Sequence, residues 1–282
     1  MIRFFLTFAL ALLIPASAFA WVQTYTCGEI NDPCLGNNKP LPTYWPNPCI
    51  TFHLNEKGTK YINFAQLQYI TKTAIETWNR PNDSALSLHL AGLTNEDRIG
   101  YNPYIKDNTN IIVFRDDNWN ESRSIMALTS VTYQNSTGLI YDADIEVNTK
   151  YWPYGIYEKD GKDVVDYQNT LTHELGHVFG LAHSDNVEAT MFPYSSTGET
   201  GLRTLAYDDI LAIRAIYPPS GQQCKFSDYY FTKPPYEMNE APAADSACAA
   251  TPLQKHPGLP VMIFACLMIA FLGHRASRLR RI

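Results

Sequence analysis

The sequence predicts an α+β domain, because two kinds of hydrophobic periodicity occur along the middle of the chain. Apolar residues recur with a helical period through residues 64–78 and again through 171–179. Between these stretches, residues 140–148 alternate apolar and polar side chains, which is typical of a strand with one buried face. About 200 residues remain between the two termini, and a chain of that length buries one sizeable core.

Further elements rest on their own local patterns. Apolar runs predict strands at residues 49–55 and 110–114. The helix through 171–179 buries an apolar stripe that runs from Leu171 to Phe179. A closing helix is predicted at 204–217, and Thr204 is a suitable N-cap for it.

The helix through 171–179 carries a candidate metal site. His173 and His177 are four residues apart, so both rings can bind one ion about 2.0–2.1 Å away. Gly180 allows a left-handed turn that ends the helix, after which His183 can supply a third nitrogen. Three protein ligands leave a fourth position open, as in catalytic zinc sites, and Glu174 can reach a water there. A surface helix with these residues by chance is the alternative, and few random sequences contain the whole run.

This run resembles the motif H-E-x-x-H-x-x-G-x-x-H of the metzincin metallopeptidases. Ser184 and a methionine turn around Met191 resemble the matrixin branch, although a core methionine is the alternative for Met191. The resemblance implies a catalytic domain at 44–219. It implies a twisted, mostly parallel sheet with an antiparallel edge strand at 124–133, about three helices, and an active-site helix that ends at Gly180.

The same resemblance implies a zinc-dependent endopeptidase that hydrolyses peptide bonds. Glu174 would be the general base that accepts a proton from the attacking water. Pro193 and Tyr194, which follow Met191, would line the specificity pocket. Two alternatives remain at this stage. One is a catalytically silent, zinc-binding adhesion module on a protease scaffold, and the other is a zinc hydrolase with a non-peptide substrate.

Two departures from the matrixin pattern concern further metals. No histidine lies between His89 and His173, so we expect the second, structural zinc of matrixins to be missing. Asp142, Asp144 and Glu146 follow one another at period two on a predicted strand, and hard oxygen ligands of this kind suit calcium. The alternative for these carboxylates is a solvated strand face.

Residues 1–20 have the form of a secretory signal peptide. Arg3 provides a basic start, residues 4–14 are apolar, and residues 18–20 have the small-x-small form of a cleavage site. The mature chain would then begin with a short N-terminal segment at 21–43. An uncleaved membrane anchor is the alternative, for which the apolar run is short.

The other end of the chain predicts a surface tether. A Pro- and Ala-rich linker covers residues 220–258, and a tail covers 259–282. The tail has an apolar run at 259–273 followed by four arginines, and it resembles bacterial C-terminal sorting tails. We therefore expect an exported protein that is secreted, periplasmic or held at the cell surface by its tail. A buried helix of the catalytic domain is the alternative for the apolar run.

The chain has six cysteines, and export would lead us to expect disulfides among them, because disulfides persist in oxidising compartments. Candidate pairs draw on Cys27, Cys34 and Cys49, and on Cys224 with Cys248, but spacing does not determine connectivity. Cys27 is followed by glycine, a faint echo of the cysteine that keeps matrixins latent, and an ordinary disulfide is its alternative. Residues 21–258 contain 17 basic and 28 acidic residues, which disfavours nucleic acid as a partner.

Overall fold

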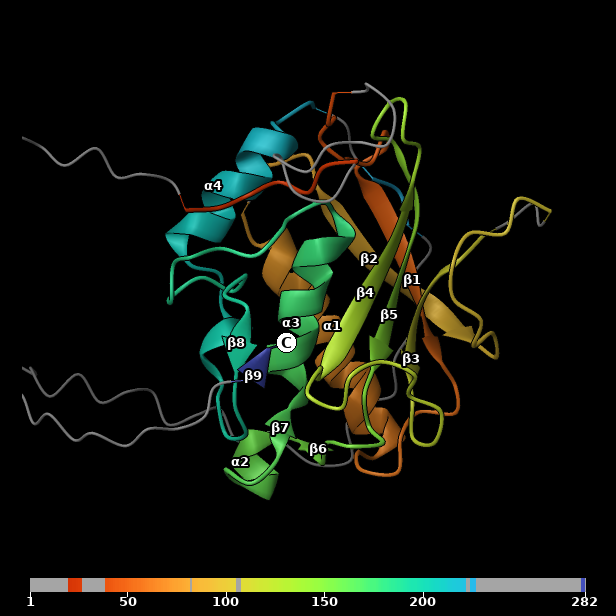
Figure 1. Cartoon of the computed structure of the whole chain (residues 1–282), viewed down its shortest axis with the longest axis vertical. Coiled ribbons are helices and arrows are strands. Elements are labelled where there is room, and N and C mark those ends of the chain that lie inside the picture. Colours follow the sequence, from red (N-terminus) through yellow and green to blue (C-terminus); the bar gives the residue numbers. More distant parts are fainter. Residues whose placement is uncertain are drawn as a thin grey trace, which may run out of the picture.

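The computed structural model describes residues 20–26, 39–81, 83–104, 108–221, 224–226 and 280–281. Its centre is a twisted five-stranded sheet with the strand order β2-β1-β3-β5-β4 (Figure 1). Strands β1, β2, β3 and β5 run parallel, and β4 pairs antiparallel with β5 at one edge. This confirms the predicted sheet. The strands are β1 (Cys49–Asn55), β2 (Ser87–Thr94), β3 (Asn110–Phe114), β4 (Ala127–Tyr133) and β5 (Ile140–Val147).

Two long helices pack against the sheet and against each other. Helix α1 (Phe64–Asn79) contacts β2 and α3, and helix α3 (Tyr167–Val178) contacts α1, β4 and β5. Figure 1 shows α3 beside the edge strand β4, with α1 behind it. The remaining elements are short: α2 (Tyr157–Asp160), α4 (Tyr207–Ile216), a 3-10 turn at Gly201–Arg203, and the strand pairs β6 (Tyr154–Gly155) with β7 (Val165–Asp166) and β8 (Tyr194–Ser195) with β9 (Arg280–Arg281).

The core lies between the sheet and these helices. The apolar face of α1 is buried as its period predicts, and Trp78 packs edge-on against Phe179 with ring centroids 4.6 Å apart. Phe52 and Ile145 face the same core from the sheet and are fully buried. The stripe from Leu171 to Phe179 is also buried, so burial of this face sets how α3 is rotated about its axis.

The N-cap predicted for the closing helix is wrong. Helix α4 begins at Tyr207, and Ala206 is its N-cap residue. The Asp209 carboxylate accepts the Ala206 amide at 2.8 Å, so a side chain inside the first turn supplies the cap. Thr204 instead ends the preceding 3-10 turn in an extended conformation.

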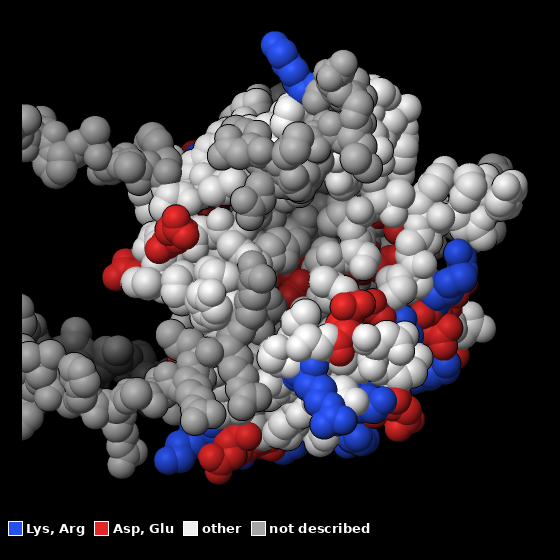
Figure 2. Space-filling model, in the orientation of Figure 1, with Lys and Arg blue, Asp and Glu red and all other residues white. Residues whose placement is uncertain are grey.

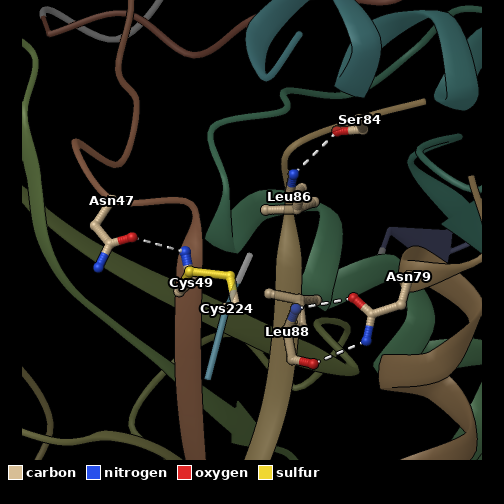
Figure 3. Close-up of a disulfide and its surroundings, with 7 residues drawn as sticks. All are labelled: Asn47, Cys49, Asn79, Ser84, Leu86, Leu88 and Cys224. Carbon is tan, nitrogen blue, oxygen red and sulfur yellow. Dashed lines mark hydrogen bonds between the residues drawn. A yellow bond between two sulfur atoms is a disulfide. The ribbon is translucent and has the colours of Figure 1, made fainter. Parts of the chain in front are cut away.

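A disulfide joins Cys49, at the start of β1, to Cys224, beyond α4 (Figure 3). Cys224 therefore does not pair with Cys248, and Cys49 does not pair with Cys27 or Cys34. The chain after α4 returns to the start of the sheet, where the Ala85 amide donates to the Tyr217 carbonyl at 2.9 Å. This return brings together two cysteines that are 175 residues apart in sequence, with 5.5 Å between their Cα atoms.

Several predicted segments lie outside the described residues. They include the signal peptide up to residue 19, most of the linker, the apolar run at 259–273, and the other four cysteines. Within the part of the chain that the structure describes, no helix is both long enough and apolar enough to cross a membrane.

Candidate active site

The N-terminal end of α3 is held by charged side chains. Asp166 is the N-cap residue, and its carboxylate accepts the Asn169 amide at 2.8 Å. Arg203 donates to that carboxylate and also to Glu158, with 2.6 Å between its Nη1 and the Glu158 Oε1. Asp166 is almost fully buried, and a charged side chain in the protein interior needs hydrogen-bond partners. This network therefore fixes the residue at which the helix starts.

The other end of α3 is shaped by a close backbone approach. Gly180 has φ +94°, and a Cβ at this position would lie 2.6 Å from the Thr43 carbonyl oxygen. Only glycine satisfies both conditions without strain. The Val178 carbonyl at the helix end accepts the Trp45 indole N–H at 2.8 Å. The helix therefore ends where the sequence predicted, within two residues of Gly180.

The N-terminal segment holds the chain that follows the helix. The Thr24 amide donates to the Gly180 carbonyl, and the Ala182 amide donates to the Val22 carbonyl, both at 2.8 Å. These bonds bracket the strand-like stretch that leads into His183. The amides of Ala20 and Trp21 lie 3.1 and 3.2 Å from the Asp208 Oδ1, so the first described residues are also anchored.

His173, His177 and His183 converge on one point. One ring nitrogen from each lies within 4.8 Å of the others. Ring centroids are 4.9 Å apart for His173 and His177, and 4.8 Å apart for His177 and His183. Among the described residues, no other group of three or more His, Cys, Asp or Glu side chains lies close enough together to hold a metal ion.

Hydrogen bonds set the tautomers of two of the three rings. His173 Nδ1 donates to the Thr190 carbonyl and His177 Nδ1 to the Leu181 carbonyl, both at 2.7 Å. A nitrogen that faces a carbonyl carries the proton, so each Nε2 keeps a lone pair. Burial lowers the pKa of both imidazoles, and for His173 the charges of the neighbouring histidines lower it further. Neutral rings with fixed tautomers are the form in which histidine binds metals.

The donor set fits a catalytic zinc ion. The Nε2 of His173 is fully buried and has no hydrogen-bond partner, which costs free energy unless a ligand occupies its lone pair. Imidazoles are borderline-soft nitrogen donors of the kind that zinc prefers, and three of them leave one coordination position for a reacting group.

Glu174 lies beside this group and is 2% exposed. Its Oε2 accepts a hydrogen bond from the hydroxyl of Thr129, a residue of strand β4, at 2.6 Å. Burial raises the pKa of the Glu174 carboxyl to about 7, and the hydrogen bond from Thr129 opposes that rise. A carboxyl that titrates near neutral pH can both accept and return a proton.

Met191 packs against helix α3 at Gly176. Its sulfur would be 2.1 Å from a Cβ added at Gly176, so glycine and methionine fit together at this point. Asp209 holds the turn by accepting the amides of Thr190 at 2.8 Å and Met191 at 3.2 Å. Since Thr190 is also the residue that bonds His173, the turn is connected to the first histidine through one backbone carbonyl.

The predicted pocket residues follow this turn. Pro193 is half-buried, and Tyr194 is 40% exposed in β8. The Tyr194 ring packs edge-on against Phe192 with centroids 5.7 Å apart. The structure thus places both residues on the chain that leaves Met191.

The carboxylates on β5 do not form a solvated strand face. Asp142 and Asp144 are at most 2% exposed, and Glu146 pairs with Arg115 at 2.6 Å. Asp144 accepts the amides of Gly100 at 2.7 Å and Ile111 at 2.9 Å. These contacts hold the loop before β3 against the sheet, which is a structural use of the carboxylates.

Sequence reasoning missed Thr129 and gave no function to Asp208 and Asp209. A threonine in an alternating strand carries no signal of its own, because its partner Glu174 is 45 residues away. Asp208 accepts the hydroxyl of Ser184 at 2.7 Å, so the residue after the third histidine is connected to α4.

A mostly parallel sheet with an antiparallel edge strand, beside a helix that carries two of three converging histidines, is the arrangement of the metzincin class. A model of the matrixin family (Peptidase M10) matches residues 44–218, which is more than half of the chain. The protein therefore belongs to the matrixins, a family of zinc-dependent endopeptidases.

Shorter similarities to individual proteins agree with this assignment. The chain is 40% identical over 70 residues to "Interstitial collagenase" of Oryctolagus cuniculus, which covers 23% of this chain and 14% of that protein. It is 44% identical over 54 residues to "Metalloendoproteinase 5-MMP" of Arabidopsis thaliana, covering 19% and 15%. It is 38% identical over 68 residues to "Matrix metalloproteinase-16" of Homo sapiens, covering 24% and 11%. The chain thus matches less than one sixth of the length of these relatives.

Proposed function

We propose that this protein is a zinc endopeptidase in which His173, His177 and His183 hold the metal and Glu174 is the general base. The observation that carries the proposal is the convergence of the three imidazoles beside a buried carboxyl whose pKa is about 7. Zinc held by these rings would supply Lewis-acid chemistry, which polarises a carbonyl and favours ionisation of water.

Glu174 would move the proton in this reaction. As its carboxylate, it would accept a proton from the water that attacks the peptide carbonyl, and it would then return that proton to the leaving amine. Its burial suits both steps, because desolvation raises its pKa towards neutrality. The tautomers of His173 and His177 stay fixed throughout by their carbonyl partners.

The edge strand β4 supports a peptide as the substrate. Its partner strand β5 occupies one side, and an extended peptide could add to the other by backbone hydrogen bonds. In Figure 2, charged side chains gather along the lower and right-hand rim of this face, and the described atoms around β4 are mostly uncharged. Backbone and apolar contacts would then dominate binding, with Pro193 and Tyr194 lining the pocket for a substrate side chain.

We propose that export removes residues 1–20. The Trp21 nitrogen lies 3.2 Å from the Asp208 carboxylate, so cleavage before Trp21 would leave a charged amino group beside a buried acid. N-terminal sequencing of the exported protein should read from Trp21, and an intact start at Met1 would contradict this proposal.

We also propose that the tail at 259–282 tethers the exported protein to a membrane. Its apolar run and its four closing arginines support this reading. Fractionation of cells that express the full chain should place it with membranes, and removal of residues 259–282 should release it. A freely soluble product that retains the intact tail would contradict the proposal.

The activity is tested by incubating the zinc-loaded protein with a mixed peptide library and locating cleavages by mass spectrometry. Glu174→Ala should keep the zinc but lose about 100- to 10,000-fold in rate, the usual contribution of a general base. Glu188→Ala, which changes an exposed glutamate that follows His183 in the sequence, is the matched control and should cleave like the parent. A folded, zinc-loaded parent that cleaves nothing would contradict the proposal and favour the silent adhesion module.

A further inference from the structure

We propose that Thr129 is a positioning residue for the Glu174 carboxylate, so that edge strand β4 orients the group that moves the proton. The inference deepens the proposed function and rests on it. The single hydrogen of the Thr129 hydroxyl has two acceptors on Glu174: the Thr129 Oγ1 lies 2.6 Å from the Glu174 Oε2 and 3.1 Å from the Glu174 backbone oxygen.

Thr129 is well placed because β4 presents it to the helix. Ala127, Thr129 and Val131 occupy alternate positions on one face of the strand, and Ala127 is buried while Val131 packs on the core. Thr129 itself pairs with Ile145 of β5, which is fully buried. The hydroxyl therefore projects from a strand whose position the core determines, and its β-branched side chain has few rotamers.

Glu174 needs such an anchor. A glutamate side chain has three rotatable torsions, and a general base must lie within hydrogen-bond reach of its proton. Among the described residues, the Thr129 hydroxyl is the one hydrogen-bond donor that contacts this carboxylate. A short bond from a hydroxyl to an ionised oxygen is among the stronger hydrogen bonds in proteins. With Oε2 fixed in this way, Oε1 is left to accept the proton.

Because the core already positions β4, Thr129 would order the Glu174 side chain before any peptide binds. A purely structural function of the hydroxyl, through the 3.1 Å contact with the Glu174 carbonyl, predicts a loss of stability without a change in kcat. The two readings therefore differ in what a variant should change.

Thr129→Val tests the proposal, because valine keeps the branched shape and removes the hydroxyl. We expect kcat for a cleaved peptide to fall about 10-fold, with KM within about twofold of the parent. Thr129→Ser, which restores the hydroxyl, should recover kcat to within about threefold. The matched control is Thr132→Val, the same change on the same strand at a position that does not contact Glu174. It should behave like the parent.

A crystal structure of each metal-free protein gives a readout other than activity. Glu174 should adopt one rotamer in the parent and in Thr129→Ser, and more than one in Thr129→Val. If the valine variant does not fold, Thr129→Ala takes its place. Unchanged kcat together with a single Glu174 rotamer in the variant that lacks the hydroxyl would overturn the proposal. An inactive parent overturns the proposed function instead, and the rotamer comparison still tests the positioning contact on its own.

Discussion

Two groups of buried carboxyls in this molecule share one electrostatic property and differ in their surroundings. Glu174 on α3 and Asp142 on β5 are each at most 2% exposed, and burial raises the pKa of each to about 7. For Asp142 the charge of Asp144 raises the pKa further. A raised pKa alone therefore does not identify an active-site carboxyl, because burial raises the pKa of any carboxyl that is removed from water.

The neighbours separate the two groups. Three imidazoles converge beside Glu174, and carbonyl partners fix the tautomers of His173 and His177. The β5 pair accepts hydrogen bonds from the loop before β3 and from β3 itself: Asn108 donates to Asp142, and the amides of Gly100 and Ile111 donate to Asp144. The proposed function assigns metal binding and proton transfer to the first group, whereas the second holds a loop to the sheet. Variants in both regions test this contrast.

The largest expected effect comes from removing one imidazole. His177→Ala should weaken zinc binding by more than the 10- to 100-fold typical of losing a group that only orients a ligand, since it removes a ligand itself. Zinc affinity is measured by competition with a chromophoric chelator. Asp144→Asn is the control from the other group and should bind zinc as the parent does. Equal zinc loss in both variants would show that the β5 pair also takes part in this binding.

A smaller effect is expected from crowding the histidine helix. Gly176→Ala would place a Cβ 2.1 Å from the Met191 sulfur and 3.1 Å from Trp78, so side chains must shift. Overpacking usually costs about 1–3 kcal/mol, which exceeds the gain of nearly 1 kcal/mol from replacing glycine in a helix. Thermal unfolding should show the loss. Gly201→Ala meets no atom within 4 Å and should leave the stability unchanged.

The smallest effect concerns the pH dependence of stability. The Asp142 pKa is raised to about 7, so between about pH 4 and pH 7 the folded protein holds a proton that the unfolded chain loses. This pair therefore makes the parent less stable as pH rises through that window. Asp142→Asn removes the charge, and it should be more stable than the parent at pH 8 by about 1–2 kcal/mol. Denaturant unfolding at pH 5 and pH 8 measures the difference.

The same variant tests the predicted calcium site. Calcium bound by Asp142 and Asp144 would stabilise the parent at pH 8, where the carboxylates are charged, and Asp142→Asn would lose that gain. An equal response of parent and variant to millimolar calcium would leave the carboxylates with their structural function alone. For the pH measurement, a free energy of unfolding that falls more steeply with rising pH in Asp142→Asn than in the parent would contradict the raised pKa of Asp142.

Local patterns predicted most of the fold and the ligand residues. The three histidines, Glu174 and Gly180 occur within eleven residues, so helical geometry brings His173 and His177 together and the turn at Gly180 returns His183 to them. The bounds of β1 and β3 agree with the predicted strands, because each strand is a short apolar run that local sequence identifies. Strand β2 was not predicted, because Gly92 and a bulge opposite Phe52 and His53 interrupt its alternation.

Long-range contacts could not be predicted in this way. Thr129 meets Glu174, and Cys49 meets Cys224, only after the whole domain has folded. Asp142 and Asp144 were placed on a strand, but their burial depends on a loop whose course periodicity does not encode. Contacts between residues close in sequence could be predicted, and contacts between residues far apart in sequence could not, whatever the residue types involved.

The bond between Cys49 and Cys224 determines how mechanical force would enter the domain. If the chain beyond Cys224 is anchored and the enzyme is pulled by flow or by a bound fibre, the load passes through this covalent bond to β1. Strand β1 lies inside the sheet, paired on both sides with β2 and β3. The disulfide therefore takes part of the load that the chain would otherwise pass to α4, the helix that holds Ser184 and the turn at Met191.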